Sequence, residues 1–157
     1  MTSIHDPVIA FFNTARSYQA AALCIQTQEE PLPCYLEDSP VRVLLALSIE
    51  LYLKAYLLSA DVTAADVREF GHKVGQACNR CKQLGLNLSD DDTTLISGIE
   101  STNIIIFDRY LETGTRSVPN DVRMQEVAET LFNQIGQLVA EHAGSRLIEE
   151  GVAPPPL

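Results

Sequence analysis

The feature that most constrains the fold is the apolar stretch 41–58, in which only Arg42, Ser48, Glu50 and Lys54 are strongly polar. Its apolar residues occupy every side of a helix, and such a helix belongs at the centre of a bundle, where it touches several neighbours. Glu50 and Lys54 are four residues apart, so they share one face in the favourable order. On a solvated face this pair would contribute little, whereas a buried pair needs further polar partners. The stretch predicts a central helix and leaves the burial of its charged pair open.

Helix start signals recur along the whole chain. Oxygen-bearing cap residues stand before proline or an acidic first turn at Asp6, Ser39, Thr63, Ser89 and Asn120 or Asp121. The acidic run 90–92 resembles a metal site, but negative charge at a helix N-terminus is favoured by the helix dipole, so capping is the preferred interpretation. The predicted helices are 7–28, 40–60, 64–84, 90–111 and 121–149, the third open to a break at Gly71.

Apolar residues at helical spacing support these helices. Three stripes follow a period of three to four residues, namely Val8, Phe11, Phe12, Ala15, Tyr18, Ala22 and Ile25; Leu95, Ile99, Thr102, Ile106 and Tyr110; and Val127, Leu131, Gln134, Leu138 and His142. The fold class we predict is all-α, an up-down bundle of four to five helices.

One domain accounts for the whole length. A chain of 157 residues with 46% apolar content can build a single core, so we expect one domain over 1–150. The tail 151–157, GVAPPPL, is expected to be extended or disordered because consecutive prolines supply no helix donors. Neither a signal peptide nor a membrane span is recognisable, and we expect a soluble, cytoplasmic protein.

The charge balance argues against broad nucleic-acid binding. The formal net charge is -10, whereas neutralising a phosphate backbone requires clustered Lys and Arg. Arg109, Arg116 and Arg123 lie close together in the sequence and could form a small basic site, but ordinary solvated charge is the commoner interpretation.

The four cysteines include one CxxC pair, Cys78 and Cys81. Structural zinc usually takes two such pairs or added histidines, and Cys24 and Cys34 are ten positions apart with no His beside them. A redox CxxC would normally follow a strand in a βαβ unit, which is not visible here. We therefore expect reduced, partly buried thiols and no metal or cofactor.

Three segments together resemble a known family. They are SIELYLKAYLL, then FGHKVGQACNRCKQLGL, then an acid-capped helix that ends in FDRYLETG. This combination is similar to the HEPN family of all-helical domains, which often read as a Glu-Leu-x-Leu-Lys helix followed by Gly-His at the next one. The resemblance implies a four- or five-helix bundle that is frequently dimeric. The residues themselves suggest that His72, just after a glycine, hydrogen-bonds to Glu50, so that Glu50, Lys54 and His72 form a polar cluster between helices.

Many HEPN proteins are metal-independent RNases, often toxins or antiphage effectors, whose signature is Arg followed four to six residues later by His near the start of a late helix. In this chain Arg68 precedes His72 by too few residues and lies at an early helix, and 119–124 contains no histidine. The signature is absent. The leading hypothesis is a non-catalytic interaction or dimerisation module, set against a divergent endoribonuclease that uses His72 as acid and base with Arg68 or Arg109 stabilising the phosphate.

Partners follow mainly from the resemblance. It implies a homodimer and, because HEPN proteins are commonly encoded beside a nucleotidyltransferase, a protein of that kind as a partner; RNA is not favoured. Nucleotide binding lacks a phosphate-cradling glycine loop. Four apolar residues outside the stripes either form an exposed patch for a partner or complete the monomer core, namely Leu36, Val41, Ile104 and Ile105.

Overall fold

The computed structural model describes residues 6–28, 38–106 and 117–149. The described elements are helices, and no strand occurs among these residues. They are α1 (Pro7–Gln26), α2 (Asp38–Ser59), α3 (Ala64–Glu69), α4 (Val74–Gln83), α5 (Asp90–Thr102) and α7 (Asp121–Glu149). The all-helical prediction is confirmed. The tail 151–157 lies outside the described residues, as do Leu36 and Tyr110.

Side-chain caps begin several helices where the sequence predicts them. In each case an oxygen accepts a backbone N–H that the first turn leaves without a helical partner. The distances are 2.8 Å from Val8 N to Asp6 Oδ1, 3.1 Å from Asp66 N to Thr63 Oγ1, 3.1 Å from Asp92 N to Ser89 Oγ and 3.2 Å from Arg123 N to Asn120 Oδ1. Asp92 also lies in the first turn of α5, which supports capping as the role of the acidic run.

Two breaks divide the middle of the chain. Gly71, with φ of 53°, separates α3 from α4, as the sequence allows. The predicted continuous helix 90–111 is wrong at Asn103, which takes a left-handed φ of 51° and ends α5 at Thr102; residues 104–106 are helical again. Asn enters this conformation more readily than most residues. The segment 107–111 lies outside the described residues.

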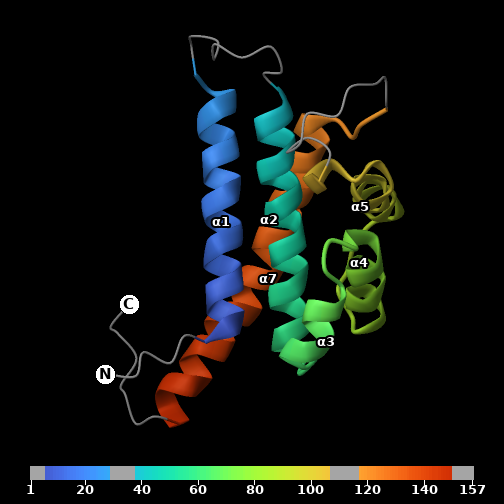
Figure 1. Ribbon diagram of the computed structural model, residues 1–157. Coiled ribbons are helices and arrows are strands. Elements are labelled where there is room, and N and C mark those ends of the chain that lie inside the picture. Colours follow the sequence, from blue (N-terminus) through green and yellow to red (C-terminus); the bar gives the residue numbers. More distant parts are fainter. Residues whose placement is uncertain (1–5, 29–37, 107–116, 150–157) are drawn as a thin grey trace.

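Helix α2 is the centre of the arrangement. Figure 1 shows α1 and α2 side by side and antiparallel, α7 behind them, and α3 to α5 on the other side of α2. Five large α2 side chains have at most 2% of their surface exposed, namely Leu45, Ile49, Tyr52, Leu53 and Leu57. The prediction of a central apolar helix is confirmed. The described helices include no segment with the length and apolar character of a membrane span.

The core also includes residues whose burial the sequence did not decide. Val41, Ile104 and Ile105 are buried, so they complete the monomer core and do not form an exposed patch. The predicted stripe of α7 is partly wrong, because Leu138 is 38% exposed while the helix buries Met124, Val127, Ala128, Leu131, Ile135 and Val139. A long helix with a nearly even apolar distribution does not show from spacing alone which stripe faces its neighbours.

Candidate functional site

A polar cluster joins α2 to the turn between α3 and α4. Lys54 Nζ lies 2.6 Å from Glu50 Oε1, and His72 Nδ1 lies 2.9 Å from Glu50 Oε2. Lys54 Nζ also donates to the carbonyl oxygen of Gly71 at 2.8 Å. The structure therefore brings together Glu50, Lys54 and His72, and it adds a backbone acceptor that the sequence did not indicate.

The Gly71 turn positions the histidine. Gly71 N donates to Arg68 O at 3.1 Å and Lys73 N donates to Phe70 O at 2.8 Å, so two short turns reverse the chain between the helices. The positive φ at Gly71 suits glycine, which has no Cβ to clash there. This turn presents its carbonyl to Lys54 and the ring of His72 to Glu50.

Burial divides the cluster into an inner and an outer part. The side chain of Glu50 is 5% exposed and that of Lys54 12%, whereas that of His72 is 45% exposed. A buried carboxylate is costly unless its oxygens are paired, and here both oxygens of Glu50 are engaged. Because a carboxylate only accepts, Nδ1 is the protonated nitrogen of His72 in this contact. The arrangement can fix a helix crossing, and it also orients an accessible imidazole.

The arginines of the alternative hypothesis do not join this cluster. Arg68 is exposed, and its Nε donates to Ala64 O at 3.2 Å along its own helix. Arg109 lies outside the described residues, as does Arg116. The structure thus provides His72 with an orienting carboxylate but brings no described arginine to it.

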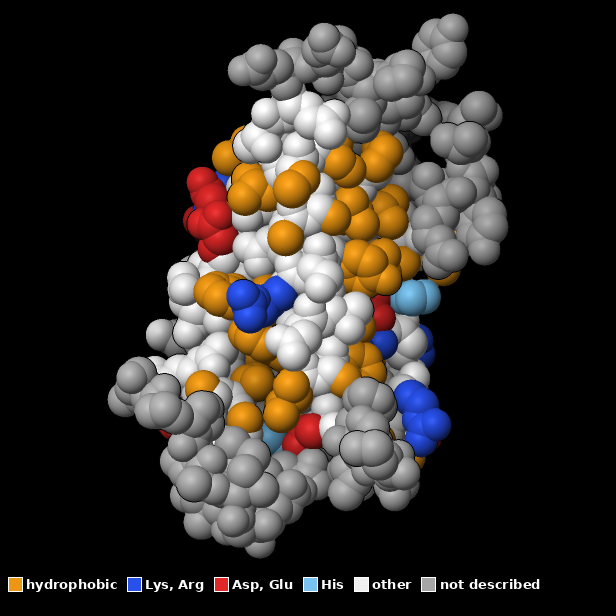
Figure 2. Space-filling model, turned by 90° about the vertical axis from the view of Figure 1, so that its left-hand side faces the viewer, with side chains coloured by type: hydrophobic (Ala, Val, Ile, Leu, Met, Phe, Trp, Pro, Cys, Tyr) orange, Lys and Arg blue, Asp and Glu red, His pale blue; other side chains and the backbone are white. Residues whose placement is uncertain are grey.

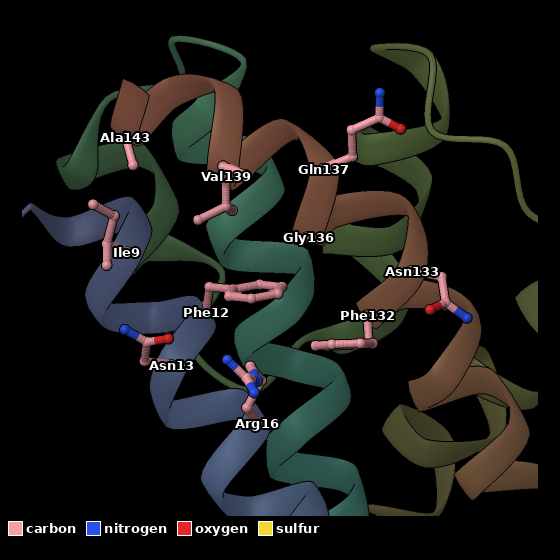
Figure 3. Close-up of a pocket in the computed structure, with 11 residues that line it drawn as sticks. Ile9, Phe12, Asn13, Arg16, Phe132, Asn133, Gly136, Gln137, Val139 and Ala143 are labelled. Atoms are coloured by element: carbon pink, nitrogen blue, oxygen red, sulfur yellow. The ribbon is translucent and has the colours of Figure 1, made fainter. Parts of the chain in front are cut away.

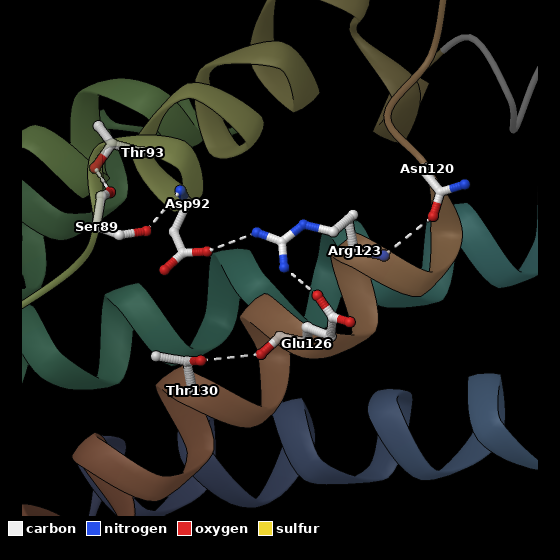
Figure 4. A network of polar contacts seen from close by, with 7 residues as sticks. All are labelled: Ser89, Asp92, Thr93, Asn120, Arg123, Glu126 and Thr130. Atoms are coloured by element: carbon white, nitrogen blue, oxygen red, sulfur yellow. Dashed lines mark hydrogen bonds and ion pairs between the residues drawn. The ribbon is translucent and has the colours of Figure 1, made fainter.

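Arg123 serves a different purpose. Its guanidinium bridges Asp92 on α5, at 3.2 Å, and Glu126 on α7 (Figure 4). Hydrogen bonding and attraction from Glu126, with a further contribution from Asp92, raise the pKa of Arg123. This network holds the beginning of α7 against the beginning of α5, so Arg123 is a structural residue.

The CxxC cysteines are enclosed in the core. Cys78 and Cys81 are buried free thiols on α4, and Cys81 Sγ lies 3.5 Å from Leu53 O. Burial raises the pKa of both thiols. No group of metal-binding side chains occurs among the residues the structure describes. Cys24 is exposed, and Cys34 lies outside the described part.

A groove between α1 and α7 is the site that the sequence did not indicate. Its first hollow, of about 430 Å³, lies between Ile9, Phe12 and Arg16 on α1 and Phe132, Gly136 and Val139 on α7. Figure 3 shows the rings of Phe12 and Phe132 on its floor. Those ring centroids are 5.7 Å apart and stacked. Figure 2 shows the side of the molecule on which α1 lies, and hydrophobic side chains are spread along this surface.

A second hollow of about 310 Å³ continues the groove toward Leu23 and Gln125. Both hollows are lined by Arg16 and Phe132, which stand where they meet. The signal was present in the sequence as a second stripe on α1, at Ile9, Phe12, Arg16, Gln19 and Leu23, beside the stripe that faces α2.

Comparison of the chain with protein-family models, with curated proteins and with solved structures finds no match.

Proposed function

We propose that this chain is a non-catalytic, HEPN-like helical interaction module. The observation that carries the proposal is the closed polar cluster, in which both oxygens of the buried Glu50 carboxylate are used within the chain. Lys54 is likewise engaged by Glu50 and by Gly71. Because Glu50 and Lys54 bond to each other and to the Gly71 turn, they hold that turn against α2 and are poorly placed to bind phosphate.

The same proposal covers assembly. The HEPN resemblance favours a homodimer or a complex with a nucleotidyltransferase-type protein, in a toxin–antitoxin or antiphage setting. The net charge of -10 favours protein partners over nucleic acid. Apolar surface in the grooves of α1 and α7 supports a role in protein contact.

One observation favours a second candidate, the divergent endoribonuclease. His72 is 45% exposed and hydrogen-bonded through Nδ1 to Glu50, an arrangement that orients an imidazole for proton transfer. What this candidate lacks among the described residues is a cation that joins His72 to stabilise a phosphate, since Arg68 is bonded to its own helix.

RNA cleavage separates the two candidates. Purified protein is incubated with structured and unstructured RNA in the presence of a metal chelator, beside His72→Asn and Arg68→Gln variants. The interaction module predicts equal background cleavage in all three samples. Specific cleavage by the wild type that His72→Asn abolishes would refute the proposal. Light scattering on the same samples measures the solution mass, and a monomer at all concentrations would exclude the homodimer.

A further inference from the structure

The groove between α1 and α7 is lined in the manner of a helical seam. Lining residues on α1 recur at alternating spacings of three and four, at Ile9, Phe12, Arg16, Gln19 and Leu23. Those on α7 do the same, at Gln125, Glu129, Phe132, Gly136, Val139 and Ala143. Alternating three and four is the spacing by which one helix presents a continuous stripe to another. Helices α1 and α7 thus each present one continuous stripe of side chains to the groove between them.

The length of the groove fits a helix. Ile9 and Leu23 are about 20 Å apart along the axis of α1, which is close to four turns. The two hollows share Arg16 and Phe132, so an occupant can run through both without leaving the groove. A small apolar ligand would fill one hollow and leave the other exposed to water.

Charge specifies the occupant further. Among the residues that the structure describes, Arg16 is the one cation that lines either hollow; no described carboxylate lines the first hollow, and Glu129 lines the second. Its guanidinium lies 5.4 Å from the ring centroid of Phe132, and within the described part of the chain it makes no hydrogen bond or ion pair. A helix that covered this guanidinium would remove it from water, and a carboxylate supplies the bidentate partner that compensates for that loss.

We propose that the groove binds an amphipathic helix of a partner protein, whose apolar face carries an Asp or Glu that pairs with Arg16. The inference rests on the proposed interaction function and specifies its partner. A second copy of this chain is less suited to the site, because each copy brings a net charge of -10 to the contact.

The test uses two synthetic peptides of about 18 residues, long enough to cross the groove. Both carry Leu at alternating spacings of three and four, and they differ at one central position, which is Glu in one and Lys in the other. Binding to the full chain is followed by NMR through the side-chain Nε–Hε signal of Arg16 and the methyl groups of Ile9 and Val139. We expect the Glu peptide to bind about tenfold more tightly than the Lys peptide and to shift all three signals.

Three variants locate the interaction. Arg16→Glu, on an exposed side chain, should reverse the preference in favour of the Lys peptide. Arg80→Glu makes the same charge change on α4 and should leave the preference intact. Ala140→Trp places a large side chain in the first hollow and should weaken both peptides. Thermal unfolding of each variant confirms that the helices are retained.

Equal affinity for the two peptides, or a preference that Arg16→Glu leaves unchanged, would overturn the proposal. So would the absence of any shift at about 1 mM peptide. If light scattering showed a dimer, and Arg16→Glu dissociated that dimer while Arg80→Glu did not, the occupant would be a second copy of this chain and the proposed partner would be wrong. Cleavage of RNA that depends on His72 would refute the proposed function and leave the peptide result standing.

Discussion

Removal of Glu50 tests whether the polar cluster behaves as a buried unit. In the Glu50→Leu variant, Lys54 keeps its charge on a side chain that is 12% exposed, and its one remaining partner among the described residues is the Gly71 carbonyl. Breaking a buried ion pair typically costs 3–5 kcal/mol, and this remaining acceptor places the expected loss at about 3 kcal/mol. Lys54→Met should cost about 2 kcal/mol, since Glu50 keeps His72 but leaves one oxygen without its donor.

The double variant makes the reasoning refutable. Replacing both charges together leaves no uncompensated ion, so Glu50→Leu with Lys54→Met should lie within about 1 kcal/mol of the wild type. Urea unfolding followed by circular dichroism measures the free energy of unfolding of all four proteins. The exposed pair of Arg123 and Glu126 provides the control, and Glu126→Leu, which leaves Arg123 bonded to Asp92, should leave the stability close to that of the wild type. A loss below about 1 kcal/mol for Glu50→Leu, or strict additivity in the double variant, would show that water solvates the cluster.

Three further predictions follow from other contacts. Glu100 on α5 accepts hydrogen bonds from the backbone N–H groups of Gly75 and Gln76 in the first turn of α4. Glu100→Ala should therefore lower the free energy of unfolding by about 1 kcal/mol, and an unchanged urea midpoint would contradict this. Burial raises the pKa of Tyr52 from the ordinary 10.0 to about 12, so its contribution to stability is complete below pH 10.0 and is lost as the pH rises through about 12. Between these two pH values, the free energy of unfolding of the Tyr52→Phe variant should therefore fall less steeply with pH than that of the wild type, which urea unfolding at a series of alkaline pH values measures. Buried Cys78 and Cys81 should resist maleimide in the native state while exposed Cys24 reacts, which peptide mapping by mass spectrometry measures, and equal labelling would show that α4 opens readily.

Much of the fold could be predicted because the signals are local. Caps such as Asp6, Thr63 and Ser89 act within one turn of their helices. A helix that is apolar on every side is stable only where other helices cover it, which predicts its position at the centre of the bundle. The break at Asn103 could not be predicted with the same certainty, because Asn also occurs inside helices and only its surroundings select the left-handed conformation.

The candidate site divides in the same way. The spacing of Glu50 and Lys54 and the Gly-His pair at Gly71 led to the cluster, although the lysine bond to the Gly71 carbonyl depends on how the turn folds. The groove could not be predicted from the sequence, because the stripe on α1 becomes one wall of a groove only when α7 lies beside it. Arg16 resembles any exposed arginine until its neighbours are known.

The two walls of the groove are far apart in the sequence, so they are synthesised at different times. Helix α1 is synthesised before α2 and can pair with it early, whereas α7 begins only at Asp121 and is synthesised after the other described helices. At its far end, His142 Nε2 on α7 lies 2.9 Å from Asp6 Oδ2 at the start of α1, a contact between residues 136 positions apart. A chain cut short before α7 has no groove at all. Whatever docks there therefore recognises only a chain in which α7 has been made and packed beside α1.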